Sequence, residues 1–184
     1  DKGFKILTYV DDIICKGSKS ETERFYQLLN DEFDCKDETY LSPDNKLSFL
    51  GFDISCEDYN PECVNYDNYN INYDGKVRVI YMDQNEAVET YLNKRNVKPV
   101  YNMLSPMSMY SMLQDTTPIT DEEEIKLYQS DIGVCNFFSI TTRYDIAFAT
   151  SRLGQLSAQP TQGARKALNK VLSYLRNNSN FYIH

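Results

Sequence analysis

The chain lacks the residues from which several common kinds of site are built. It has no tryptophan, a single histidine at its last position, and five cysteines that form no Cys-x-x-Cys pair. Zinc sites draw mainly on cysteine and histidine ligands, so a zinc site is not expected. Unpaired cysteines in odd number are typical of reduced thiols, which predicts an intracellular protein, cytoplasmic or nuclear.

Long apolar runs are also absent. The longest, such as "IAFAT", cover only a few residues, whereas a helix that spans a membrane needs about 20. The chain shows no basic and then apolar leader, so we expect neither secretion nor a membrane anchor. Its 184 residues are 41% hydrophobic and 13% aromatic, which is enough for the core of one good-sized domain or two small ones.

Charge is distributed unevenly along the chain. The formal net charge is −8, yet beyond residue 142 the only acid is Asp145. An acidic body repels phosphate, so nucleic-acid contact is expected in the basic tail or through a bound metal. Solvated faces of amphipathic helices explain the tail equally well. The bases of this tail are Arg143, Arg152, Arg165, Lys166, Lys170 and Arg176.

The N-terminal stretch "TYVDDIIC" carries Asp11 and Asp12 inside an apolar, β-branched run. The pattern predicts two short strands joined by a tight turn. A helix is predicted next, from Ser18 to Phe33, with Ser20 as its N-cap and Glu23 closing a capping box. Its expected apolar face consists of Phe25, Leu28, Leu29 and Phe33.

A second β region follows. "KLSFLGFDISC" alternates like a single strand, with Leu47 and Phe49 on one side and Phe52 and Ile54 on the other. It is expected to pair with "GKVRVIYMDQ". The loop between them, "EDYNPECVNYDNYNINYD", is too polar for a core and too aromatic for a plain linker.

The rest of the chain reads as helical. We expect a helix over 85–96, an irregular linker over 97–120, and three helical patterns over 120–140, 143–158 and 161–177. Phe137, Phe138, Ile146 and Phe148 are expected in the core between these helices; a base-stacking platform is the alternative reading. The chain is therefore α+β over 1–96, a linker over 97–120, and helical over 121–184.

Four ordered blocks carry a family resemblance. They are "YVDDIIC", "FLGFDI", "SDIGVCNFFSITTRYDIAFATSRL" and "QPTQGARKALNKVLSYLRN". In order and approximate spacing they resemble the reverse transcriptase of copia-type long-terminal-repeat retrotransposons. The resemblance implies a partial reverse-transcriptase palm (β-hairpin with YVDD, helix, second hairpin) followed by a helical thumb or connection part. The chain departs from the family at Tyr144, where the family has proline, and near Gly163, where it usually has histidine.

The resemblance also implies a chemistry, RNA-directed DNA synthesis by two-metal phosphoryl transfer. Asp11 and Asp12 match the family's paired catalytic carboxylates, which hold Mg²⁺, and Tyr9 precedes them. The family's third carboxylate lies on a strand well upstream, and only Asp1 precedes this hairpin. We therefore expect Mg²⁺ only if another segment completes the site. A plain solvated turn is the alternative reading of the two aspartates.

Binding residues are expected in three places. By resemblance, Tyr9 and the hairpin residues Phe49, Leu50 and Gly51 contact nucleic acid. The tail bases Arg165, Lys166 and Lys170 are expected to contact a template-primer, weakly at most. Residues 57–74 are expected to bind a protein partner or a second copy, because tyrosine suits protein interfaces; alternatively their rings cover the adjacent sheet. The loop's candidate contact residues are Tyr59, Tyr66, Tyr69 and Tyr73.

Two functions remain open at this point. In the first, a transposon-derived fragment is retained as a binding or structural module without catalysis. In the second, the chain is the C-terminal part of an active enzyme whose upstream palm and fingers it lacks. The sequence favours the first, because the third carboxylate is absent and the tyrosine-rich loop is an addition to the family pattern. A decaying element without a selected role is a third hypothesis.

Overall fold

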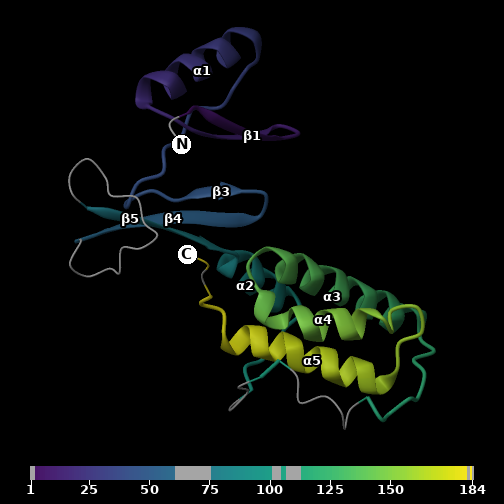
Figure 1. Cartoon of the computed structure of the whole chain (residues 1–184). Helices are drawn as coiled ribbons and strands as arrows, with labels where there is room; N and C mark the ends of the chain where they lie inside the picture. Colours follow the sequence, from purple (N-terminus) through teal and green to yellow (C-terminus); the bar gives the residue numbers. More distant parts are fainter. Residues whose placement is uncertain (1–2, 61–75, 101–104, 107–112, 182, 184) are drawn as a thin grey trace. The chain divides into compact units, whose positions relative to one another are not determined.

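The computed structural model describes residues 3–60, 76–100, 105–106, 113–181 and 183. The chain divides into two compact units between Met82 and Asp83, and each is described by itself. The first holds two small antiparallel sheets and a helix, and the second is helical (Figure 1). This is the mixture of strands and helices expected from the sequence patterns.

The predicted N-terminal hairpin is confirmed. Strand β1 (Lys5–Tyr9) pairs antiparallel with β2 (Asp12–Lys16). Tyr9 lies opposite Asp12, so Val10 and Asp11 form a two-residue turn. A turn this short fixes the register of the hairpin and therefore the position of both aspartates.

Helix α1 (Lys19–Glu32) begins with a capping box, but two residues earlier than expected. Ser18 is the N-cap, and its backbone N–H donates to Oε2 of Glu21 over 2.9 Å. The hydrogen bond with Ser18 holds the pKa of Glu21 below its usual range. The prediction of Ser20 and Glu23 was wrong, because Ser20 already lies in the first turn. No residue of α1 is buried.

The second β region forms the hairpin that the family resemblance implied, where the alternating pattern alone predicted one strand. Strand β3 (Leu47–Phe49) turns into β4 (Phe52–Tyr59), which lies between β3 and β5 (Val77–Asp83) in the sheet. Leu50 and Gly51 both have positive φ, 53° and 80°, as in a type I′ turn. This turn reverses the chain within the alternating run, so Phe49 and Phe52 pair across the strands. Their rings touch edge to face at 6.0 Å.

The second unit packs its helices around one apolar core. Its elements are α2 (Asn85–Lys94), α3 (Glu122–Thr141), the short 3₁₀ helix η2 (Tyr144–Ile146), α4 (Ala147–Gly154) and α5 (Gln162–Asn177). Figure 1 shows α3, α4 and α5 side by side. The core includes Val88, Leu92, Tyr128, Ile132, Cys135, Phe138, Ile146, Leu153, Leu168, Val171, Leu172 and Leu175.

This core corrects the predicted domain boundary and linker. Val88 and Leu92 of α2 are fully buried in it, so the helical unit begins at Asp83 and not near residue 121. The described end of the linker is irregular but docked. The backbone N–H of Ile119 donates to the Pro160 carbonyl, and that of Gln162 donates to the Thr117 carbonyl. These bonds tie it to the start of α5.

Two of the four residues expected in the core are exposed. Phe138 and Ile146 are buried as predicted, whereas Phe137 is 40% and Phe148 74% exposed. On α4 the buried positions are Ala149, Thr150 and Leu153. Phe148 therefore lies on the outer side of the helix. Adjacent residues of a helix point about 100° apart, so at Phe137–Phe138 only one of the two rings faces the core.

The structure shows the state of four cysteines and the length and polarity of the described helices. The described cysteines Cys15, Cys35, Cys56 and Cys135 are all free thiols. Burial raises the pKa of Cys135 to about 12, which keeps it protonated and unreactive. Among the described residues, no helix is both long and apolar enough to cross a membrane.

A buried carboxylate joins three helices of the second unit. Asp131 of α3 is fully buried. It accepts two hydrogen bonds from Arg95, directly after α2, at 2.8 and 3.0 Å, and one from Arg165 of α5 at 2.7 Å. The Tyr91 hydroxyl also donates to it. Burial and this carboxylate raise the pKa of Tyr91, so its hydroxyl stays a donor.

We expect Asp131→Asn to destabilise the helical unit by about 3–5 kcal/mol, because two guanidinium groups lose the charge that compensates them. Urea unfolding followed by circular dichroism measures the loss. Asp115→Asn is the matched control, since Asp115 pairs with the exposed Lys166 and its loss changes the unfolding midpoint little. Equal midpoints for the two variants would contradict the assigned role of Asp131.

Candidate metal site and nucleic-acid interface

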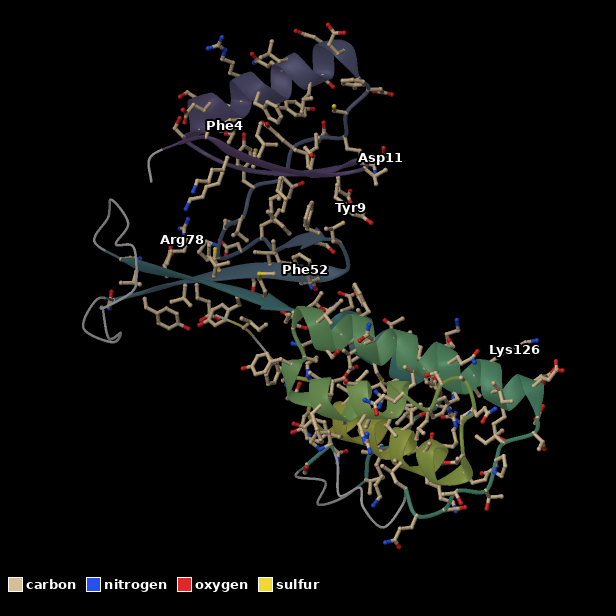
Figure 2. The ribbon with its side chains drawn as sticks, turned by 45° about the vertical axis from the view of Figure 1, so that its right-hand side comes forward. Phe4, Tyr9, Asp11, Phe52, Arg78 and Lys126 are labelled. Atoms are coloured by element: carbon tan, nitrogen blue, oxygen red, sulfur yellow. The ribbon has the colours of Figure 1, made fainter. Side chains whose placement is uncertain are left out.

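The two candidate metal ligands lie where the N-terminal hairpin turns. Asp11 is the second turn residue and Asp12 the first residue of β2, and both are exposed. Figure 2 shows Asp11 at one end of the hairpin and Phe4 at the other. The Phe4 ring touches Phe25 of α1 edge to face, with the ring centroids 5.3 Å apart, so this contact between α1 and the hairpin lies at the end remote from Asp11.

The turn itself is strained at Val10. Its φ is 52°, in the left-handed region, and 85% of the residue is exposed. A β-branched residue rarely adopts this conformation, and an outlier of this kind costs on the order of 1–3 kcal/mol. Its exposure leaves little packing to offset that cost. Strain of this kind gathers at functional turns, which supports a former or present task for the adjacent aspartates.

The donor chemistry of the turn fits Mg²⁺ only in part. Carboxylate oxygens are the ligands that Mg²⁺ prefers, and it accepts water at its other positions. A two-metal site, however, needs carboxylates that bridge and fix both ions. Across the described ranges no group of three or more histidine, cysteine, aspartate or glutamate residues could hold a metal ion. Whether another segment completes the pair Asp11 and Asp12 stays a prediction.

The residues expected to contact primer differ in how far they are exposed. Tyr9 ends β1 and is 59% exposed, close to the aspartates in the hairpin. Phe49 is 6% exposed, so its ring belongs to its own sheet and offers nothing to a nucleic acid. Leu50 and Gly51 form the β3–β4 turn, where Gly51 is exposed. Contact through Tyr9, Leu50 and Gly51 stays a prediction.

The tail bases do not form one exposed basic patch. Arg165 is 9% exposed and donates to Asp131, so it serves the core and not a surface. Lys166 is exposed, but its Nζ lies 2.9 Å from a carboxylate oxygen of Asp115. Lys170 is half-buried. Of the three bases expected to contact nucleic acid, Arg165 is buried. Contact through Lys166 and Lys170 stays a prediction.

Of the loop tyrosines, the structure describes only Tyr59. It is half-buried on β4, its hydroxyl donates to Glu57, and it lies 2.9 Å from the Tyr81 hydroxyl of β5. The hydrogen bond with Glu57 raises the pKa of Tyr59. At this residue the hydroxyl is bonded within its own sheet. Tyr66, Tyr69 and Tyr73 lie outside the described residues, so the protein-contact prediction for 57–74 stays a prediction.

One functional candidate escaped the sequence patterns. Arg143 is 1% exposed, and its guanidinium donates to both Asp145 oxygens, at 3.0 and 2.8 Å. It lies over the Phe181 ring at 5.0 Å and the Tyr174 ring at 5.9 Å. Its Nη1 has no hydrogen-bond partner in the described structure. Only the closeness of Arg143 to Asp145 could have suggested a pair, and nothing local pointed to Phe181.

Comparison with known proteins gives one relative. Over 104 residues, 55% of this chain, the sequence is 30% identical to the retrovirus-related Pol polyprotein from transposon RE1 of Arabidopsis thaliana. The chain spans only 7% of that polyprotein. No family model and no solved structure matches. The similarity supports a retrotransposon origin for the chain.

We expect Val10→Gly to stabilise the hairpin by about 0.5–1 kcal/mol, because glycine adopts positive φ without steric cost. Amide hydrogen exchange of β1 and β2 measures the change. The matched control is Thr8→Gly, which places glycine in an extended strand position and is expected to reduce protection. Equal loss of protection in both variants would show that Val10 is not strained.

Proposed function

We propose that this chain derives from the reverse-transcriptase region of a copia-type retrotransposon and acts as a non-catalytic binding module. Three observations support the derivation. The four sequence blocks occur in family order, the relative is a transposon Pol polyprotein, and the aspartate pair lies on a tight antiparallel hairpin. The nucleic-acid partner implied by this origin is a template-primer.

The observation that carries the absence of catalysis is the incomplete carboxylate set. Asp11 and Asp12 are exposed at the turn, and the described residues supply no third ligand to them. Phosphoryl transfer of this class depends almost wholly on positioning and charge stabilisation by two metals. Losing several kcal/mol of that stabilisation lowers the rate by orders of magnitude.

A catalytic alternative has one observation in its favour. Ile6, Leu7 and Ile13 of the N-terminal hairpin are between 43% and 56% exposed, an unusual amount of apolar surface for so small a sheet. A further protein segment could cover these side chains and supply the missing carboxylate. The chain would then be part of an active two-metal reverse transcriptase. The incomplete set makes this the second choice.

We expect the chain to incorporate no labelled nucleotide on a primed RNA or DNA template with Mg²⁺, beyond the level of Asp11→Asn. The reason is the missing charge stabilisation at the metal pair. Asp34→Asn, which removes an exposed acid outside the turn, is the matched control. Template-dependent incorporation that Asp11→Asn abolishes and Asp34→Asn preserves would restore the catalytic alternative.

We also expect weak binding of template-primer at physiological salt, tightening as salt is lowered, because each neutralised phosphate releases counterions. Fluorescence anisotropy of a labelled duplex at several salt concentrations gives the slope. Lys166→Glu and Lys170→Glu together are expected to flatten it. A slope that these changes leave intact would remove α5 from the contact surface.

A further inference from the structure

The outer side of η2 and α4 carries an unusual pair of exposed rings. Tyr144 is 65% and Phe148 74% exposed. Tyr144 lies in η2 and Phe148 lies four residues later in α4. The opposite side is formed by Ile146, Ala149 and Leu153, which are buried. The two rings therefore contribute nothing to the core that their neighbours build.

Tyr144 is supported from behind by a stacked set of groups. The Phe181 ring meets it edge to face at 5.4 Å, and the Arg143 guanidinium lies over Phe181 at 5.0 Å. Phe181 is fixed in turn by its backbone N–H, which donates to Asn85 over 3.1 Å. A ring held in this way loses little conformational entropy when a ligand binds. Arg143 is thus a positioning residue for the Tyr144 platform.

The surface beside the rings is positive. Arg152 lies one turn after Phe148 on the same side of α4 and is exposed. Its Nη1 donates to the Gln155 amide oxygen over 2.7 Å, a neutral partner that orients the guanidinium without cancelling its charge. Asp145, the acid nearest to Arg152 in the sequence, forms an ion pair with Arg143. No aspartate or glutamate follows it in the chain.

We infer that Tyr144, Phe148 and Arg152 form a binding stripe for single-stranded nucleic acid, with bases stacked on the two rings and a phosphate on the guanidinium. The inference rests on the proposed binding function and names its site. Exposed rings stack on the faces of unpaired bases, which a duplex hides between its base pairs. A protein could also cover two rings, but Arg152 meets a neutral amide and the neighbouring Asp145 is paired with Arg143, so the charge left beside the rings favours a polyanion.

Fluorescence anisotropy of a labelled 12-nucleotide oligothymidine tests the stripe. We expect Tyr144→Ala and Phe148→Ala each to weaken binding about 5-fold or more. Arg152→Gln is expected to reduce the salt slope by about 0.7, the value for one single-strand phosphate. The matched controls, Leu127→Ala and Lys126→Gln, change exposed residues near the start of α3 (Figure 2) and are expected to bind like the unmodified chain. Circular dichroism confirms that each variant is folded.

Three results would overturn the stripe. Unchanged affinity in both aromatic variants would remove the rings from the contact, while the unmodified chain still binds and the proposed function stands. A 12-base-pair duplex that binds as tightly, with the same sensitivity to Phe148→Ala, would exclude base stacking. A loss of oligomer in Phe148→Ala with unchanged oligothymidine affinity would assign the face to protein contact. No binding of any nucleic acid by the unmodified chain would refute this site together with the nucleic-acid role.

Discussion

The helical unit depends on the burial of one carboxylate. Asp131 receives hydrogen bonds from Arg95, Arg165 and Tyr91, so a single side chain joins α3 to α5 and to the α2 segment. A buried charge is tolerated only when it is compensated, and here two guanidinium groups share one carboxylate. The packing of apolar side chains is non-directional, whereas these hydrogen bonds are directional and fix which faces of the three helices meet.

The first unit is held by a different kind of constraint. Its hairpins are defined by two-residue turns with positive φ at Val10, Leu50 and Gly51, and α1 by the capping box at Ser18. Neither β1, β2 nor α1 contains a buried residue. In the N-terminal hairpin and α1, local geometry therefore takes the place of core packing, whereas the β3–β4–β5 sheet buries Phe49, Cys56, Val77 and Val79. Such structure fixes where two aspartates lie but supplies little around them to complete a metal site.

Local signals in the sequence predicted the elements well and their roles less well. The hairpin at Asp11 follows from short-range turn chemistry. The helices predicted over 120–140 and 161–177 lie close to the observed α3 and α5. The prediction of a single strand through Phe49 and Phe52 was wrong. A two-residue turn within an alternating segment does not interrupt the alternation, so the pattern alone does not reveal the turn. The burial of Arg165 and the exposure of Phe148 depend on partners distant in sequence, and no local pattern encodes them.

The basic tail shows how such long-range partners change a functional reading. Arg143 forms an ion pair with Asp145, and Arg165 forms one with Asp131 inside the unit. Lys166 forms an ion pair with Asp115 at the surface. The described hydrogen-bond partners of Arg152 and Arg176 are neutral: Arg152 donates to Gln155, and Arg176 donates to the Asn93 side chain and the Val97 carbonyl, so neither charge is compensated by these contacts. A charge count therefore overstates the basic surface and misplaces it. On the outer face of α4, the positive charge of Arg152 lies one turn from the exposed Phe148 ring.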